Sequence, residues 1–297
     1  MIGRGTARSC TSSAVVAAVR AGGTIRFSCG PKPVTIRMLA TAKVLNSRRE
    51  VALDGGGLVT LSGAGRRRIL YMDTCDPAQV FTTSHCQDQA TPRLVVENLA
   101  FADGNSSGQD FDGGGGGAIF ARGGRLRIVH STFVHNRCDR TGPDVGGGAV
   151  RALSQSAGAP VQVVDSRFTA NVCSNGGALS SIGVSWNVVR SRFVANRAIG
   201  AGANPARSGT PGGGSGGAIY NDGNRFTLTI SGSRLTDNHA AEGGGAIFFV
   251  SNDRTGTLAI RDSVLQHNRS DGFQTAGLPG IFFLGAGRPA IVDSVLR

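Results

Sequence analysis

The chain has few of the residues on which several common protein classes depend. Aromatic side chains make up only 6% of its 297 residues, and no short nucleic-acid-binding motif is present, so we expect no nucleic-acid partner. No apolar run approaches the ~20 residues that a helix needs to cross a bilayer, which predicts no transmembrane segment. The six cysteines show no CxxC spacing and no neighbouring His cluster, which argues against a zinc site.

Acidic residues and lysine are also scarce. The 31 basic residues outnumber 19 acidic ones, giving a formal net charge of +12, and only Lys32 and Lys43 among the basic residues are lysine. A strongly basic protein favours anionic partners. We therefore expect the partner to be an acidic polysaccharide or another anionic surface polymer.

Glycine, by contrast, is abundant, and it belongs to a repeated pair of motifs. The first motif is Gly-Ala followed by an aliphatic residue, and the second is Ser-x-(Phe/Leu)-x-x-Asn. Copies of the first begin at Gly117, Gly148, Gly177, Gly217 and Gly245. Copies of the second begin at Ser131, Ser166, Ser191, Ser233 and Ser263, and a sixth starts at Ser294. Self-similarity of this kind is typical of a repeat solenoid.

The spacing within each repeat favours strands over helices. Upstream of each Phe or Leu, apolar residues flank a more polar one, as in Leu126-Arg127-Ile128 before Phe133. Such alternation is the period of a half-buried strand. Stacked coils would place equivalent residues about 4.8 Å apart. We therefore expect aliphatic columns inside, and Ser and Asn columns at the corners with amide hydrogen bonds along the stack.

These motifs resemble the GGA(I/L/V) and FxxN repeats of polymorphic outer-membrane proteins and, more broadly, the pectate-lyase-like superfamily. The resemblance covers about residues 94–297, and Asp54-Gly55-Gly56-Gly57 looks like part of an earlier coil. It implies an all-β fold, a single-stranded right-handed parallel β-helix. It does not imply one activity, because this fold hosts lyases, hydrolases, esterases, adhesins and inert surface proteins.

The repeat runs on without a linker, so we predict one domain, 1–297, with an N-terminal cap at 1–23 and coils at 24–297. Thr11-Ser12-Ser13 predicts the start of a short capping helix that ends at Ala21-Gly22-Gly23. The last repeat stops at Arg297 with no obvious cap. We therefore expect a covering partner or a dimer contact at that end, or a truncated chain.

An even number of cysteines is typical of disulfides in an oxidising compartment. Local pairing predicts Cys10–Cys29 and Cys75–Cys86. Cys138 and Cys173 each follow a repeat Asn by two residues, so stacked coils would bring them together. We expect a secreted or cell-surface protein. Because the basic N-terminus lacks the apolar stretch of a signal peptide, such a peptide has been removed or export follows another route.

Arginines precede the repeat Phe or Leu in three consecutive coils, at Arg167, Arg192 and Arg234. Stacking predicts an arginine ladder on one outer face. The alternative is a solvated face that Asp165 and Asp262 balance.

The long insertions lie between each repeat Asn and the next Gly-Gly-Ala, so stacking predicts a wall of loops along one edge. Beside it, the residue after each Ala-aliphatic pair should point outward, which gives a row that includes aromatic and Arg side chains. We predict that Phe120, Arg140, Arg151 and Phe248 bind the substrate, by stacking on sugar rings and pairing with carboxylates. The alternative is loops whose Asp and Gly residues only form turns.

A polysaccharide lyase needs Ca²⁺ or Arg to neutralise a uronate and a base to remove a proton. Asp110, Asp112 and Asp139 are predicted calcium ligands, with Asp144 as a further one. Catalytic candidates are Asp144, Arg207 as neutraliser or base, and Tyr220 as base. A glycosidase instead needs two carboxylates, for which Asp222 is a further candidate acid.

The Asp-Asp, His-Gly and Arg-x-Lys motifs of polygalacturonases are absent, as is the Asp-His signature of pectate lyases. Two hypotheses therefore stay open. The protein recognises, and in an enzymatic version cleaves, an extended acidic polysaccharide in the loop-walled groove, or it is a non-catalytic adhesin or structural cell-envelope protein.

Overall fold

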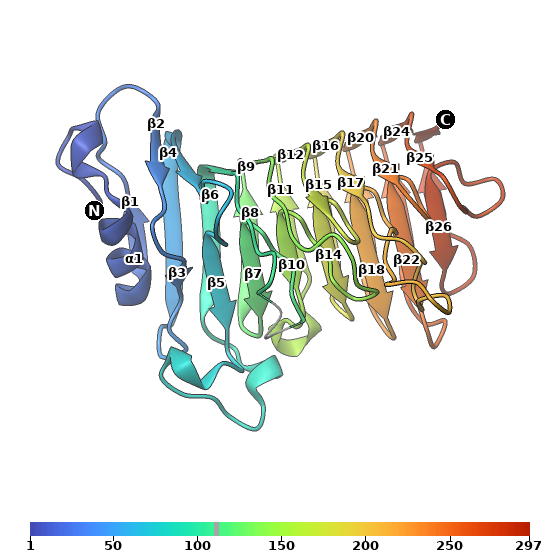
Figure 1. Cartoon of the computed structure of the whole chain (residues 1–297), viewed down its shortest axis with the longest axis horizontal. Helices are drawn as coiled ribbons and strands as arrows, with labels where there is room; N and C mark the ends of the chain where they lie inside the picture. Colours follow the sequence, from blue (N-terminus) through green and yellow to red (C-terminus); the bar gives the residue numbers. More distant parts are fainter. Residues whose placement is uncertain (110–112) are drawn as a thin grey trace.

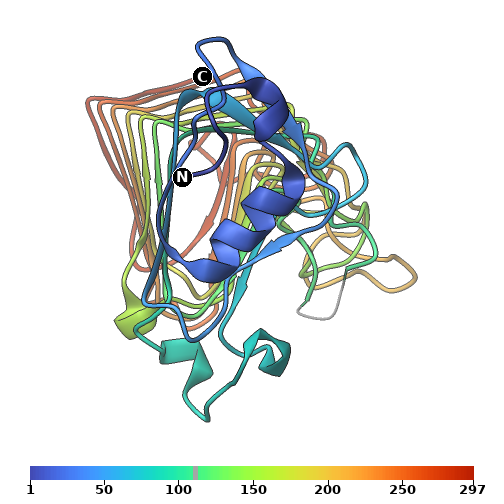
Figure 2. The same cartoon turned by 90° about the vertical axis from the view of Figure 1, so that its left-hand side faces the viewer.

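The computed structural model describes residues 1–109 and 113–297. Strands of successive coils pair in parallel and build sheets that run the length of the molecule (Figure 1). Viewed from the N-terminal end, the coils overlie one another around a common interior (Figure 2). The fold is an all-β parallel β-helix with one short N-terminal α-helix, as the repeat predicted.

The largest sheet begins with two short strands, β1 (Gly23–Arg26) and β2 (Val34–Arg37), that both pair with the long strand β4 (Glu50–Ser62), which in turn pairs with the long strand β6 (Arg93–Ala102). From there the sheet continues as two runs, because each later coil bends at its repeat Ser. The first run is β8 (Arg125–Val129), β11 (Val161–Val164), β15 (Trp186–Val189), β19 (Thr227–Ser231), β23 (Thr257–Arg261) and β27 (Ala290–Val292). The second run is β9 (Thr132–Val134), β12 (Arg167–Thr169), β16 (Arg192–Val194), β20 (Arg234–Thr236), β24 (Val264–Gln266) and β28 (Val295–Leu296).

Two further sheets complete the coils. The eight-stranded sheet holds the Ala-aliphatic motif: β3 (Ala42–Lys43), β5 (Leu70–Asp73), β7 (Ile119–Arg122), β10 (Val150–Ala152), β14 (Leu179–Ile182), β18 (Ile219–Gly223), β22 (Ile247–Ser251) and β26 (Ile281–Leu284). The four-stranded sheet follows the repeat Asn: β13 (Val172–Cys173), β17 (Arg197–Ala198), β21 (His239–Ala240) and β25 (Arg269–Ser270).

The repeat residues form the expected columns. Phe133, Phe168 and Phe193 are buried and stack with ring centroids 4.7 Å apart, which matches the inter-strand spacing. At one corner, the Asn171 Nδ2 donates to the Asn196 Oδ1 at 2.9 Å, and the Asn136 Nδ2 donates to the Asn171 Oδ1 at 2.9 Å. The predicted Asn ladder is confirmed, and Asn136, Asn171 and Asn196 are fully buried, so their amides are satisfied by one another and by the backbone.

Glycine is required where the coil turns into the eight-stranded sheet. A Cβ on Gly117 would lie 2.3 Å from the Arg137 carbonyl oxygen and 2.5 Å from that of Gly148. These contacts are closer than van der Waals packing allows, so only glycine lets the corners stack.

The N-terminal cap forms as predicted. Helix α1 (Ser12–Ala21) begins after Thr11, whose side chain accepts from the Ala14 N–H at 3.3 Å. It buries Val15 and Val19 and covers the first coil (Figure 1). No helix of the described residues is both long and apolar enough to cross a membrane. The described residues also form four 3₁₀ turns outside the strands: η1 (Ala7–Ser9), η2 (Pro77–Gln79), η3 (Cys86–Asp88) and η4 (Ser156–Gly158).

All three predicted disulfides are present, Cys10–Cys29, Cys75–Cys86 and Cys138–Cys173. They indicate an oxidising environment. The last coil exposes Val292 and Val295, at 40% and 46%; a contact at that end stays a prediction.

Candidate functional site

The residues that follow each Ala-aliphatic pair form one continuous row on the eight-stranded sheet. Strand register aligns Tyr71, Phe120, Arg151, Ser180, Tyr220, Phe248 and Phe282. We call these residues the covered row. The flanking Ile119 and Ala121 belong to the interior core and Phe120 does not, so the row lies on the outer side of the sheet.

The covered row is buried except at Phe282 in the last coil, which is partly exposed. Phe120, Arg151, Tyr220 and Phe248 are each at most 1% exposed. The aromatic rings instead stack on one another, with centroids 5.0 Å apart for Tyr220 and Phe248. Phe120, Arg151 and Phe248 are therefore covered in this structure, and their binding to a sugar chain stays a prediction.

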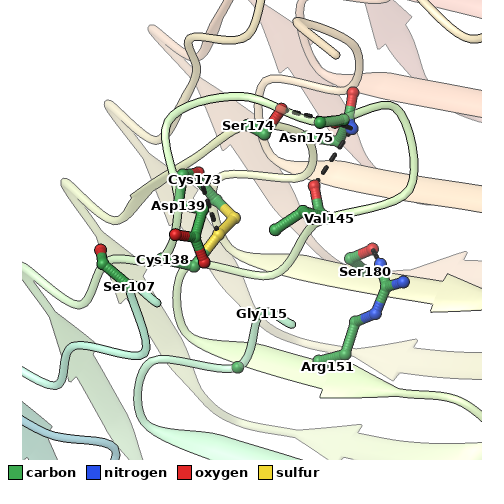
Figure 3. Close-up of a disulfide and its surroundings, with 12 residues drawn as sticks. Ser107, Gly115, Cys138, Asp139, Val145, Arg151, Cys173, Ser174, Asn175 and Ser180 are labelled. Carbon is green, nitrogen blue, oxygen red and sulfur yellow. Dashed lines mark hydrogen bonds between the residues drawn. A yellow bond between two sulfur atoms is a disulfide. The ribbon is translucent and has the colours of Figure 1, made fainter. Parts of the chain in front are cut away.

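The loop 137–146 is held in place by residues of the next coil. The Asn175 Nδ2 donates to the carbonyl oxygens of Pro143 and Val145, at 2.8 and 3.1 Å, and the Ser174 Oγ donates to that of Gly142 at 2.7 Å. Figure 3 shows the Cys138–Cys173 disulfide beside these contacts and, below the loop, Arg151 reaching Ser180. The loop therefore folds over the sheet instead of standing away from it.

The loop 199–215 is fixed through Glu242. Its carboxylate accepts from the Gly202 N–H at 2.7 Å and from both Arg207 Nη atoms at 2.8 and 2.7 Å. The Arg207 guanidinium holds the pKa of the Glu242 carboxyl below its ordinary value, and the same pair raises the pKa of Arg207. A raised pKa favours the protonated form, so Arg207 is unsuited to act as a base. Its guanidinium contacts Glu242 and not the other catalytic candidates.

The other three catalytic candidates are brought together by Asn204. The Asn204 Nδ2 lies 2.8 Å from the Asp222 Oδ2 and 3.3 Å from the Asp144 Oδ1, and it also contacts the Tyr220 hydroxyl. The Tyr220 hydroxyl donates to the Asp222 Oδ2 at 3.2 Å. Two carboxylates from different coils thus share one amide. Sequence reasoning missed Asn204, because a single Asn in a Gly- and Pro-rich loop has no counterpart in the repeat.

The two carboxylates have different surroundings. Partial burial raises the pKa of Asp222, and the negative charge of Asp144 adds to this effect. Asp144 is exposed to solvent. Burial also raises the pKa of Tyr220 well above its ordinary value, so the phenol stays protonated and is a poor base.

A buried positive charge lies behind this pair. Arg151 donates from Nη1 to the Ser180 Oγ at 2.7 Å, and its Nε has no hydrogen-bond partner within the described residues. Burial lowers the pKa of Arg151 to about 10, while the charges of Tyr220, Asp144 and Asp222 act in the opposite direction. Arg151 is therefore cationic at neutral pH.

An accessible strip runs beside the covering loops, two residues further along the strands. Register aligns Ile182, Asp222, Val250 and Leu284, and all four are partly exposed. We call these four residues the open row. Asp222 is thus part of the open row, and a hollow of about 260 Å³ lined by Ile182 and Leu153 adjoins this row.

The remaining predicted residues lie apart from the carboxylate pair. Arg140 is exposed and lines a hollow of about 430 Å³ with His135 and Arg137. The Asp139 Oδ1 accepts from the Gly108 N–H at 2.8 Å. Asp110 and Asp112 lie outside the described residues. Within residues 1–109 and 113–297, no group of three or more His, Cys, Asp or Glu is arranged to hold a metal ion, so Ca²⁺ binding stays a prediction.

No family model, curated protein or solved structure matches this chain. Its function is therefore inferred from the geometry of the site alone.

Proposed function

We propose that this protein binds an extended acidic polysaccharide along the open row and hydrolyses it with Asp144 and Asp222. The observation that carries the proposal is the Asp144–Asn204–Asp222 arrangement, in which one amide holds two carboxylates of unlike environment. Pairs of titratable groups whose surroundings push their pKa values apart are suited to divide the roles of acid and base. A net charge of +12 supports an anionic substrate.

In this mechanism Asp222 is the acid, because its raised pKa keeps a proton available at higher pH than an ordinary aspartate does. It protonates the oxygen of the scissile glycosidic bond as that bond breaks. Asp144, which is exposed, acts on the anomeric carbon or on a water beside it. The two distances from the Asn204 Nδ2 limit the separation of the nearest carboxylate oxygens to roughly 6 Å, which is closer to a retaining than to an inverting arrangement.

Hydrolysis is favoured over elimination by what surrounds the pair. A lyase needs a base strong enough to remove a carbon-bound proton, and the predicted bases do not suit that role. Tyr220 is buried with a raised pKa, and Arg207 is engaged by Glu242.

The test is incubation with a panel of uronic-acid polysaccharides, with and without Ca²⁺, followed in two ways. Reducing-end release without ultraviolet absorbance of unsaturated products is the expected result. Asp222→Asn and Asp144→Asn should each lower the rate at least 100-fold, the usual contribution of a general acid or base. Asp262→Asn is the matched control, because it removes an equal charge from the exposed turn between β23 and β24 and should leave the rate unchanged.

The pH profile adds a directional check. Because the acid must be protonated, activity should fall as pH rises through the raised pKa of Asp222, and Asp222→Asn should abolish that limb. If Asp144→Asn and Asp222→Asn both cleave the polysaccharide at the wild-type rate, Asp144 and Asp222 are not the catalytic pair. Ultraviolet absorbance of unsaturated products would show that the reaction is elimination and not hydrolysis.

A second proposed function is non-catalytic binding, as an adhesin or structural cell-envelope protein. Its support is the closure of both loops over the covered row, which leaves the aromatic rings of Phe120, Tyr220 and Phe248 buried. Binding of an acidic polysaccharide without either cleavage product would favour this function.

Both functions agree with a secreted or cell-surface location. The three disulfides support it, since such bonds persist in oxidising compartments. The likeness of the repeats to those of polymorphic outer-membrane and pectate-lyase-like proteins supports it in the same sense. Labelling of intact cells with a membrane-impermeant reagent would contradict the proposal if the protein were protected.

A further inference from the structure

A second feature with no role in the proposed chemistry lies on the outer surface of the first run of strands. A hollow of about 410 Å³ opens where β6, β8 and β11 lie side by side. Its lining combines three arginines, Arg93, Arg125 and Arg127, with Gln162 and with a short wall made by Ala159 and Pro160. The arginines are exposed, whereas the neighbouring Leu94 and Leu126 point into the core.

The three positive charges are close together, and Glu50 is the register partner of Arg93 on the side away from Arg125. Arg93 and Arg125 are direct register partners in neighbouring parallel strands, and Arg127 lies two residues further along β8. Like charges placed opposite each other in a sheet are destabilising. None of the ion pairs in the described part of the chain includes Arg93, Arg125 or Arg127. An anion seated in the hollow would relieve this repulsion.

The arginine ladder predicted from the sequence provides a comparison on the same molecule. Arg167 and Arg192 are register partners and are exposed. The adjacent Asp165 is already engaged, because it accepts from Arg190 at 2.7 and 2.6 Å. The ladder therefore presents equal charge without the wall that Ala159 and Pro160 add to the hollow.

The hollow is connected to the open row. Ala159 lines both the arginine hollow and the smaller hollow that contains Leu153 and Ile182. Ile182 is the register partner of Asp222. A chain that lies on the open row can therefore continue past Ala159, around the corner of the coil, and reach Arg125 and Arg127.

We propose that the arginine hollow is a second binding site for an acidic glycan, and that it takes the carboxylate or sulfate groups of residues outside the cleavage position. Guanidinium groups bind such groups through two parallel N–H···O hydrogen bonds, which gives geometric selectivity as well as charge. The low wall of Ala159 and Pro160 fits the side of a sugar ring, and the lining contains no aromatic ring on which a nucleobase would stack. The site shares only its ligand class with the proposed function and does not require Asp144 or Asp222.

The experiment measures binding by calorimetry at low salt, with a hexamer of galacturonic acid, a sulfated hexasaccharide and a neutral hexamer of N-acetylglucosamine. The Arg125→Ala/Arg127→Ala variant loses two charges from the hollow. The Arg167→Ala/Arg192→Ala variant loses two from the ladder and is the matched control. All four side chains are exposed, so both variants should melt within a few degrees of the wild type.

We expect the hollow variant to bind the acidic hexamer at least tenfold more weakly and the ladder variant to stay within about threefold of the wild type, since each lost charge-assisted hydrogen bond weakens binding substantially. Binding of either acidic hexamer supports the proposal, and the tighter of the two identifies the anionic group. Equal weakening in both variants would show attraction to net charge alone and overturn it. Equal affinity for the neutral hexamer, or tighter binding of a DNA oligomer of equal charge, would also overturn it.

Binding and cleavage failures remain distinguishable. If the hollow variant loses affinity while Asp222→Asn retains it and loses cleavage, both proposals stand. If Asp222→Asn has no effect on any product but the hollow variant still loses affinity, only the proposed hydrolysis fails.

Discussion

The corner ladder of asparagines is the feature on which the stability of the coils depends most directly, and Asn171→Ala tests it. Asn171 is fully buried. Its Oδ1 accepts from the Asn136 backbone N–H and from the Asn136 Nδ2, both at 2.9 Å. Its Nδ2 donates to the Phe133 carbonyl oxygen at 3.1 Å and to the Asn196 Oδ1 at 2.9 Å. Alanine removes all four bonds.

The cost follows from the groups left behind. The Asn136 N–H and the Phe133 carbonyl each lose this partner in a buried corner, and a buried group without its partner costs about 1–3 kcal/mol. Two such groups put the loss at about 4 kcal/mol. For a chain of this size that corresponds to a fall in melting temperature of about 8 °C or more.

Thermal melting by circular dichroism, with the disulfides intact, measures the effect. Asn187→Ala is the control, because Asn187 lies on the outer side of β15 and makes one side-chain hydrogen bond, to the Gln162 Oε1 at 3.0 Å. Its melting temperature should stay within about 2 °C of the wild type. The ladder account is refuted if Asn171→Ala melts no lower than Asn187→Ala.

Three other changes have defined outcomes. Phe168→Ala should lower the free energy of unfolding by about 3–5 kcal/mol, because it leaves a cavity in the ring stack. Phe168→Leu should lower it by under about 1.5 kcal/mol, because leucine occupies the same column in later coils. Equal melting temperatures of the two variants would contradict this. Cys138→Ser with Cys173→Ser should lose about 2–4 kcal/mol in the same assay, and no change would mean that the bond does not constrain the unfolded chain. Folding lowers the pKa of Glu242, so the stabilisation by Arg207 is present above the ordinary glutamate pKa and is lost as pH falls through the pKa of the folded state. The difference in unfolding free energy between wild type and Arg207→Ala should therefore shrink on acidification. If this difference in unfolding free energy grows on acidification, the direction given for the Glu242 pKa shift is wrong.

The columns of the fold were predictable because each column requires the same residue type in every coil. Arg167, Arg192 and Arg234 were expected to form a ladder, and they are register partners in β12, β16 and β20. The pairing of Cys138 with Cys173 followed from the same stacking. Local capping chemistry likewise predicted α1, through the side chain of Thr11.

The covering of the eight-stranded sheet was not predictable in this way. It depends on residues that occur once and have no column, namely Asn175, Asn204 and Glu242. Their partners lie on loops of unequal length, so no period in the sequence relates them. The candidate site was therefore predicted in part: Asp144, Tyr220 and Asp222 meet, but the residue that joins them and the burial of the neighbouring row come from tertiary contacts.

The central claim is that Asp144 and Asp222 act as a pair on an acidic polysaccharide. The most direct measurement is the release of reducing ends from polygalacturonate by wild type, Asp222→Asn and the control Asp262→Asn, with ultraviolet absorbance recorded in the same samples. The account predicts release by wild type and Asp262→Asn, at least 100-fold slower release by Asp222→Asn, and no absorbance change. Release by Asp222→Asn at the wild-type rate would contradict it.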